Sequence, residues 1–341
     1  SNQLAPVLAR FPGYSKLKII PSGLLHFIPF EALISELPDK MNGNYDELAY
    51  LIKNFEIAYA SSVTSLYYQK NPVTREETRS AVLAFAPGYG DSSKLYSSSA
   101  RGNLQNLDWN NQEVEAIGQY FDVNRYLEAM ANESIFKSEA SKYAVLHLAA
   151  HAVVNHEEPM NSYLAFSAEN IAADNDGYLH ASEIFDMNLG ADLTVLSACN
   201  TGYGKLYNGE GALSLAMAFS YAGCPSVLMS YWPADDQSTS KLMNYFYANL
   251  SEGMRKDEAL RNAKLPYLEN ASAFRKSPAF WNNYVVKKED ETYAFWNYYS
   301  IIGDVSALNI KKKSSLIPYS MWAIGLVILL FIMFRVIKRF L

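Results

Sequence analysis

The sequence contains few cysteines and few charged residues, and each scarcity excludes a class of protein. Only Cys199 and Cys224 occur among 341 residues, too few for a disulfide framework, so we expect free thiols in a reducing compartment. A net charge of −6, with 19% of the residues charged, gives no support for a nucleic-acid-binding surface. The chain opens with SNQLAPVLARF, which lacks the basic start and apolar run of a secretory signal peptide.

Two motifs are incomplete and indicate neither a phosphate loop nor a metal site. GYGKL at residues 202–206 suggests a phosphate loop but lacks its GK[ST] ending and leading glycine spacing. His156, Glu157 and Glu158 lie together, but no partner ligands are spaced around them. A solvated loop is the better interpretation of that cluster.

What the chain does contain is enough apolar material for a large core. Half of its residues are hydrophobic and 14% are aromatic, which argues against disorder. Buried strands are predicted near residues 79–91, 144–150, 193–199 and 225–232, and helices at 106–121, 131–143, 210–223 and 238–253. Alternating strands and helices predict an α/β fold with a mostly parallel sheet covered on both faces.

The C-terminal segment has a different composition. Residues 317–334 read IPYSMWAIGLVILLFIMF and carry no charge, and basic residues flank them on both sides. A transmembrane helix needs roughly 20 apolar residues, so we predict a span at 317–337 with a basic tail at 338–341. A core helix at the chain end is the alternative. We expect a single-pass C-terminal anchor, a linker at 304–316 and a folded domain on the cytoplasmic side, although the balanced flanking charges do not fix the orientation.

A histidine and a cysteine follow two of the predicted strands. His151 comes directly after AVLHLAA, and Cys199 ends LTVLSAC. Active sites of open α/β sheets lie beyond the carboxyl ends of the strands, so neighbouring strands would bring these side chains together. A thiolate is a strong nucleophile, an imidazole can hold or donate the proton, and backbone N–H groups of the next turn can stabilise an oxyanion. The pair therefore indicates acyl transfer, most simply peptide hydrolysis.

Each residue also has a plainer interpretation. Cys199 alone is more often a small buried hydrophobe, and His151 alone is more often a core histidine with satisfied polar atoms. His147 lies in the middle of its strand. Cys224, between Gly223 and Pro225, is expected in a helix-to-strand turn at the opposite edge of the sheet.

The order and spacing of several motifs resemble those of the CHAT domain, a caspase-like cysteine peptidase domain of clan CD related to separase. The motifs are PSGLLHFIPFEAL, FEIAYASSVTSL, HLAAHAVVN, GYLHASEI, LTVLSACNTGYG, NGEGALSLAMAFSYAGCPSVLMSYWPADDQST and FWNYYSIIGD. The resemblance covers nearly everything from about Ile19 to Asp304. It implies a caspase-like three-layer α/β/α fold across residues 1–303, with an N-terminal part at 1–78 and a catalytic core at 79–303.

The resemblance also implies roles for individual residues. His151 matches the catalytic histidine and Cys199 the nucleophile, with the N–H groups of Ala152 and Cys199 as oxyanion donors. The family often has glycine at the position of Ala152, but any residue supplies the N–H. Asp236, with Asp235 next, matches a separase segment whose aspartate receives a basic P1 side chain. Capping of the following helix by Asp236 or Ser238 is the alternative interpretation.

These implications lead to one expected function and two alternatives. We expect a membrane-anchored cysteine endopeptidase that cleaves protein or peptide substrates, needs no cofactor and is activated by a partner such as a TPR or sensor module. The first alternative is a catalytically silent CHAT-like scaffold tethered to the membrane, although a scaffold has no reason to keep both His151 and Cys199. The second is a thiol hydrolase that acts on a small amide.

Overall fold

The structure is a computed structural model that describes most of the chain in separate ranges. These are residues 4–10, 12–36, 48–70, 80–89, 104–167, 175–198, 205–207, 211–231, 236–269, 299–310 and 312. Cys199, Asp235 and the predicted membrane segment 317–337 lie outside them.

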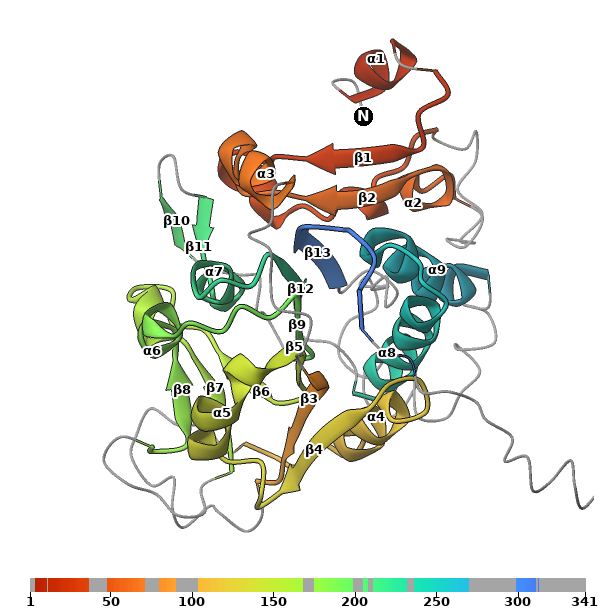
Figure 1. Ribbon diagram of the computed structural model, residues 1–341. Coiled ribbons are helices and arrows are strands. Elements are labelled where there is room, and N and C mark those ends of the chain that lie inside the picture. The colour runs from red at the N-terminus through yellow and green to blue at the C-terminus, as the bar shows by residue number, and fades with distance from the viewer. Residues whose placement is uncertain are drawn as a thin grey trace, which may run out of the picture. The chain divides into compact units, whose positions relative to one another are not determined.

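Strands of the described ranges form one large twisted sheet, which lies between two groups of helices in Figure 1. Its order is β1-β2-β13-β12-β9-β5-β3-β4, and all neighbours are parallel except β12 and β13. The strands are β1 (Lys16–Ile19), β2 (Glu56–Tyr59), β3 (Ser80–Pro87), β4 (Val123–Glu128), β5 (Tyr143–Leu148), β9 (Leu193–Leu196), β12 (Ser226–Ser230) and β13 (Tyr299–Gly303). The prediction of a largely parallel sheet is confirmed.

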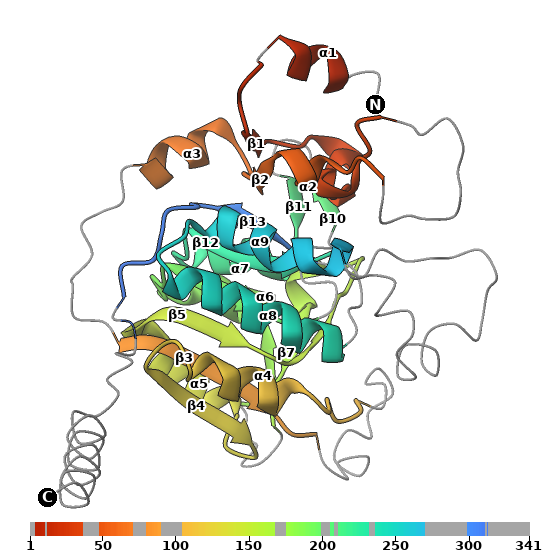
Figure 2. The same ribbon diagram turned by 90° about the vertical axis from the view of Figure 1, so that its right-hand side faces the viewer.

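Helices cover both faces of this sheet, as expected for strands that are apolar on both sides. One face carries α4 (Asn110–Ile117), α8 (Asp236–Ser251) and α9 (Lys256–Glu269), which Figure 2 shows in front of the sheet. The other carries α5 (Glu133–Glu139), α6 (Ala181–Asp186) and α7 (Leu215–Tyr221). Along β3, Val82 and Ala84 pack into the first layer, whereas Leu83 and Phe85 pack into the second, because successive side chains of a strand point to opposite faces.

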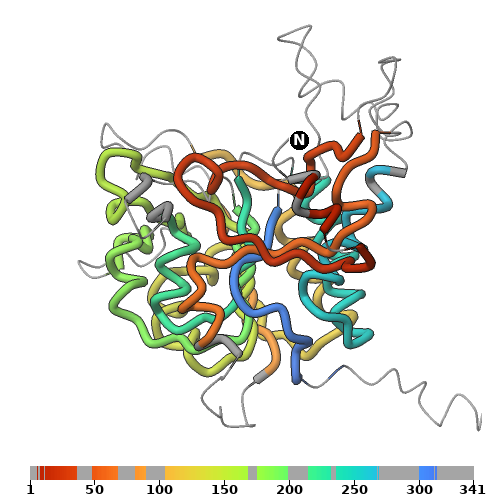
Figure 3. Tube along the Cα trace, turned by 90° about the horizontal axis from the view of Figure 1, so that it is seen from above, coloured from red at the N-terminus to blue at the C-terminus, as the bar shows by residue number. Residues whose placement is uncertain are grey.

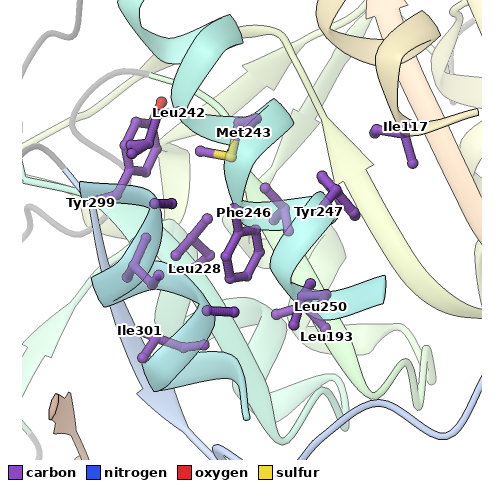
Figure 4. Close-up of a cluster of buried hydrophobic side chains, with 14 of the residues drawn as sticks. Ile117, Leu193, Leu228, Leu242, Met243, Phe246, Tyr247, Leu250, Tyr299 and Ile301 are labelled. Atoms are coloured by element: carbon purple, nitrogen blue, oxygen red, sulfur yellow. The ribbon is translucent and has the colours of Figure 1, made fainter. Parts of the chain in front are cut away.

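The first layer is held by an apolar stripe along α8. Leu242, Met243, Phe246 and Leu250 recur at the three- and four-residue spacing of one helix face, and all are at most 4% exposed. Figure 4 shows these side chains against residues of β9, β12 and β13. This packing fixes α8 above the centre of the sheet.

The two ends of the folded region meet in the sheet, because β13 lies between β2 and β12 (Figure 3). A buried polar cluster joins them from η2 (Phe30–Ala32), β2, β13 and α9. Glu31 accepts hydrogen bonds from the Tyr59 hydroxyl and from Ser300 Oγ (2.9 Å), and its Oε1 lies 3.6 Å from Lys264 Nζ. Burial lowers the pKa of Lys264, and Glu31 opposes that shift.

The remaining described elements include small helices and two small antiparallel sheets. The helices are α1 (Leu4–Ala9), η1 (Gly23–Phe27), α2 (Leu51–Asn54), α3 (Val63–Lys70), η5 (Ala140–Lys142) and η6 (Pro159–Asn161). One small sheet has the order β6-β7-β8, from β6 (His151–Val153), β7 (Tyr163–Ala165) and β8 (Tyr178–His180). The other pairs β10 (Lys205–Tyr207) with β11 (Gly211–Leu213).

The predicted helix at 210–223 is wrong in its first turn. Residues 211–213 pair as strand β11, and the helix α7 begins only at Leu215. Ser214 ends the extended segment, because its Oγ accepts a hydrogen bond from the Met217 N–H and so caps α7. The short β-hairpin therefore precedes a shorter helix.

The chain divides into two compact units, Ser1–Lys311 and Lys312–Leu341. At the end of the first unit, where we expected the linker to begin, Val305 is 8% exposed and its carbonyl accepts a hydrogen bond from the Lys256 N–H. Leu308 and Ile310 pack beside it on the α8 and α9 layer. Within the described ranges, no helix combines the length and apolar composition needed to cross a bilayer.

Candidate active site

The site lies where β5 and β9 end, side by side. The two strands are parallel neighbours, and Leu148 of β5 is the register partner of Leu196 of β9. His151 follows Leu148 by three positions, and Cys199 follows Leu196 by three positions in the sequence. The two strands are therefore neighbours, which is the condition for His151 and Cys199 to lie at one edge of the sheet. Cys199 itself lies outside the described residues, so its pairing with His151 stays a prediction.

The fold holds His151 at the start of β6, outside the main sheet. The residue is half-buried, and it pairs in register with Ala165 of β7. Its backbone N–H donates to the Tyr89 hydroxyl (2.9 Å), and its ring lies against the Tyr89 ring with the centroids 4.8 Å apart. The Tyr89 hydroxyl in turn donates to the Ala165 carbonyl (2.9 Å). One hydroxyl thus bridges two register partners at the point where β6 begins.

The imidazole of His151 is oriented by a backbone carbonyl. Its Nε2 lies 2.7 Å from the Gln105 carbonyl oxygen. A carbonyl can only accept a hydrogen bond, so Nε2 carries the proton and Nδ1 is the basic nitrogen of the neutral ring. Burial lowers the pKa of His151, and the hydrogen bond to Gln105 partly offsets this shift. The neutral form is therefore favoured near neutral pH, which is the form that accepts a proton from a thiol.

The start of α4 ties the loops of this edge together. Asn110 Nδ2 donates to the carbonyl of Pro87 (3.0 Å), the last residue of β3, and to the carbonyl of Ala149 (3.5 Å), the residue after β5. The backbone N–H of Trp109 donates to Asp236 Oδ2 (2.8 Å), at the first residue of α8. Asp236 therefore joins the two helices at their N-termini. Its predicted contact with a basic substrate side chain stays a prediction.

A buried polar group beneath the site was not anticipated from the sequence. His147, in the middle of β5, lies with Nδ1 3.0 Å from the Tyr247 hydroxyl and Nε2 2.9 Å from Glu113 Oε1. Burial and the Glu113 charge raise the pKa of Tyr247 well above its usual value. The three side chains join β5 to α4 and α8, so His147 has a structural role. Helical periodicity alone predicted that Glu113 and Tyr247 lie on helices, but not that these helices face one strand.

The other predicted residues are placed as follows. Ala152 is the central residue of β6, opposite Leu164 of β7. Cys224 is fully buried between α7 and β12, at the amino end of that strand, as expected for a packing residue. His156, Glu157 and Glu158 are exposed, and within the described ranges no group of three or more His, Cys, Asp or Glu side chains is arranged to hold a metal ion.

Residues 2–288 match the CHAT domain family. The chain belongs to that family. Two curated relatives are tetratricopeptide repeat protein 28 of Homo sapiens, 28% identical over 112 residues, and its counterpart in Mus musculus, 27% identical over 112 residues. The matched segment is 33% of this chain and only 4% of the length of either relative. The activities and partners of those long proteins are therefore not established for this CHAT chain.

Solved structures show the fold that the CHAT chain shares. The Arg-specific cysteine proteinase gingipain R matches with a TM-score of 0.51 at 11% identity, over 90% of this chain and 67% of the gingipain chain. The Saccharomyces cerevisiae separase–securin complex matches with a TM-score of 0.46 at 13% identity, over 82% of this chain and 14% of that chain. The gingipain match confirms a mixed α/β fold of the caspase-like type, and the separase match is too weak to add to it.

Proposed function

We propose that this CHAT chain is a membrane-anchored cysteine endopeptidase in which Cys199 is the nucleophile and His151 transfers the protons. The observation that most directly supports the proposal is the register of β5 with β9, which gives His151 and Cys199 equal spacing beyond two paired strand ends. The lowered pKa of His151 and its oriented ring add to it, because a neutral imidazole with a defined basic nitrogen is suited to general-base catalysis.

The proposed reaction proceeds through an acyl-enzyme. Nδ1 of His151 takes the proton of the Cys199 thiol, and the thiolate forms a C–S bond with the scissile carbonyl carbon. The N–H groups of Ala152 and Cys199 stabilise the oxyanion. The C–N bond then breaks, and the proton on His151 goes to the leaving amine. Water, deprotonated by the same imidazole, cleaves the thioester and releases the acid and the thiol.

A basic P1 residue is the proposed specificity. Asp236 and Asp235 are the proposed acidic groups, since a buried or partly buried carboxylate favours Arg or Lys and disfavours acidic side chains. Gingipain R, which shares the fold, is an Arg-specific proteinase. Asp236 Oδ2 accepts a hydrogen bond from the Trp109 N–H, and this bond would hold the carboxylate in place to bind a basic side chain.

The proposed setting is a membrane surface facing the cytoplasm, reached through residues 317–337. Residues 317–334 of this segment carry no charge and are largely apolar, and basic residues flank that run on both sides, which supports the anchor. We also propose that a tetratricopeptide repeat or other sensor protein activates the enzyme. The curated relatives are tetratricopeptide repeat proteins, which is consistent with such a partner.

Labelling with a peptide-based thiol electrophile tests the dyad. We expect selective modification of Cys199, located by mass spectrometry, and its loss in His151→Ala. Cys224 is an internal control, because it is fully buried in the folded protein. Equal modification of Cys199 and Cys224 would contradict the proposal and favour a catalytically silent scaffold. Modification by small electrophiles but by no peptide-length reagent would favour hydrolysis of a small amide.

Cleavage of a peptide library tests the specificity separately. The wild type should prefer Arg or Lys at P1, and Asp236→Ala should lose that preference while still cleaving. Asp257→Ala is a matched control, since Asp257 lies on α9 in an ion pair with Arg255. An acidic or purely aliphatic preference in the wild type would rule out the proposed pocket.

A further inference from the structure

We propose that Tyr89 and Asn106 are positioning residues for His151, which together fix its backbone and select the protonated nitrogen of its ring. Contacts within the described residues place the His151 ring, and the expected effect on turnover rests on the proposed function. Neither residue belongs to the motifs that identified the site, and neither is predicted to touch the substrate.

The hydroxyl of Tyr89 fixes the main chain on both sides of the histidine. It accepts from the His151 N–H and donates to the Ala165 carbonyl, so it uses both of its hydrogen-bonding directions. Tyr89 is 1% exposed, and its side chain packs with Ala165 and Tyr178. A buried hydroxyl with two partners is costly to displace, which makes it a rigid support for the start of β6.

The backbone of Tyr89 fixes the segment that aims the ring. Its N–H donates to Asn106 Oδ1 (2.8 Å), and the residue next to Asn106 is Gln105, whose carbonyl accepts from His151 Nε2. Leu104 and Leu107 of the same segment pack against Tyr89, Ala165 and Tyr178. The Tyr89 hydroxyl therefore holds the backbone of His151, and the Tyr89 N–H holds the segment whose Gln105 carbonyl accepts from the His151 ring.

This arrangement has a chemical consequence that packing alone would not have. The Gln105 carbonyl holds the proton on Nε2 and keeps Nδ1 available as the base. If the 104–107 segment shifts, the ring loses that acceptor, and the two neutral tautomers become closer in population. A base with the wrong tautomer cannot take the thiol proton, so the loss falls on kcat and not on substrate binding.

The ring nitrogens of His151 report the tautomer directly by nitrogen-15 NMR. The chain has five histidines, and the signals of His151 are assigned as those lost in His151→Gln. At a pH where the ring is neutral, the wild type should show one tautomer with the proton on Nε2. Tyr89→Phe and Asn106→Ala should both shift the ring nitrogens toward the averaged values of a tautomer mixture. Asn106→Asp keeps an acceptor oxygen at that position and should restore the wild-type signals.

The kinetic readout separates positioning from folding. Tyr89→Phe and Asn106→Ala should lower kcat for a peptide substrate roughly tenfold with KM unchanged, as expected from losing one or two hydrogen bonds that orient the base. Their pH–rate profiles should also shift on the acid side, because the environment of the His151 ring changes. Tyr120→Phe is the matched control. It removes a tyrosine hydroxyl whose hydrogen bond to Asn244 Oδ1 of α8 (3.0 Å) involves neither His151 nor Gln105, and it should leave both readouts unchanged.

The outcomes distinguish this inference from the proposed function. Wild-type tautomer and kcat in both variants, in folded protein that cleaves peptide, would overturn the positioning roles and leave the peptidase intact. A wild-type protein that cleaves nothing, yet shows the Nε2–H tautomer and its loss in the variants, would refute the peptidase and support the positioning. A wild type with the proton on Nδ1 would overturn the inference.

Discussion

Replacing Glu31 with alanine should destabilise the fold strongly and in a pH-dependent way. Glu31 is 3% exposed and accepts hydrogen bonds from the Tyr59 hydroxyl and Ser300 Oγ. Its Oε1 lies 3.6 Å from Nζ of Lys264, which is 1% exposed. Removing one member of a buried ion pair leaves the other charge without compensation and costs about 3–5 kcal/mol. We expect a loss of unfolding free energy of that order in denaturant titrations of Glu31→Ala.

The sign of the pH dependence follows from Lys264. Burial already lowers its folded pKa below that of the unfolded chain, and Glu31 is the group that opposes the shift. Between the two pKa values the unfolded chain binds more protons, so the contribution of this lysine to stability rises with pH. Without Glu31 the pKa of Lys264 in the folded protein falls further, so the pH range over which stability rises extends to lower pH. The deficit of Glu31→Ala should therefore shrink between about pH 7 and about pH 9, below the titration of free tyrosine.

A double variant provides the control. Glu31→Gln with Lys264→Met should be more stable than Glu31→Gln alone, because it removes an ammonium that has lost its partner. A Glu31→Ala deficit below about 1 kcal/mol, or one that stays constant over the same pH range, would refute the argument that a charged Lys264 depends on Glu31.

Three further predictions concern the core, a helix cap and the site histidine. Phe246→Ala, at a fully buried position of α8, should lower the free energy of unfolding by about 3–5 kcal/mol and Phe246→Leu by clearly less; equal losses would contradict a packed stripe. Asn132→Ala should cost about 1 kcal/mol in the same titration, since Asn132 Oδ1 accepts from the Ile135 N–H at the start of α5. The lowered pKa of His151 means that its contribution to stability is lost as the pH falls, so His151→Gln should flatten the decline in stability on the acid side; an unchanged slope would contradict a half-buried, neutral ring.

The elements predicted best from the sequence are those with continuous apolar runs. The predicted strands that correspond to β3, β5, β9 and β12 and the predicted helix that corresponds to α8 carry strong apolar patterns, and local pattern is sufficient to place them. For α5, capping residues in the sequence allow a start at Asn132 or Ser134, and Asn132 is the one whose side chain caps the helix. The position of Cys224 between a helix and a strand also followed from local signals.

Weakly patterned elements were missed or mistaken. No strand was predicted at β4, whose sequence VNRYLE is largely polar because it lies at the sheet edge, with one neighbour among the described strands. The three-residue strands β6 and β8 are too short for a period-2 pattern to be read. β11 was assigned to a helix because its Gly-Ala-Leu sequence continues the helical composition of α7. Only tertiary pairing separates the two segments.

The candidate site was predictable in its chemistry but not in its support. The reactive residue types and their places after two strands are visible in the sequence, and the register of β5 with β9 agrees with them. The Gln105 carbonyl, the Tyr89 hydroxyl and the Asp236 bond to Trp109 are contacts between distant segments. A backbone carbonyl has no residue signature, so no sequence motif could have indicated that it orients the imidazole.

The insertion of β13 between β2 and β12 has a consequence for biosynthesis. Residues 299–303 are made after every other strand of the described sheet, yet they join its N-terminal pair to the rest. Until they leave the ribosome, the growing chain carries an open β12 edge and a detached β1–β2 ribbon, and both are prone to wrong pairing. The main sheet can therefore be completed only once residues 299–303 have been made, and a nascent chain interrupted before Gly303 holds His151 beside an unfinished sheet.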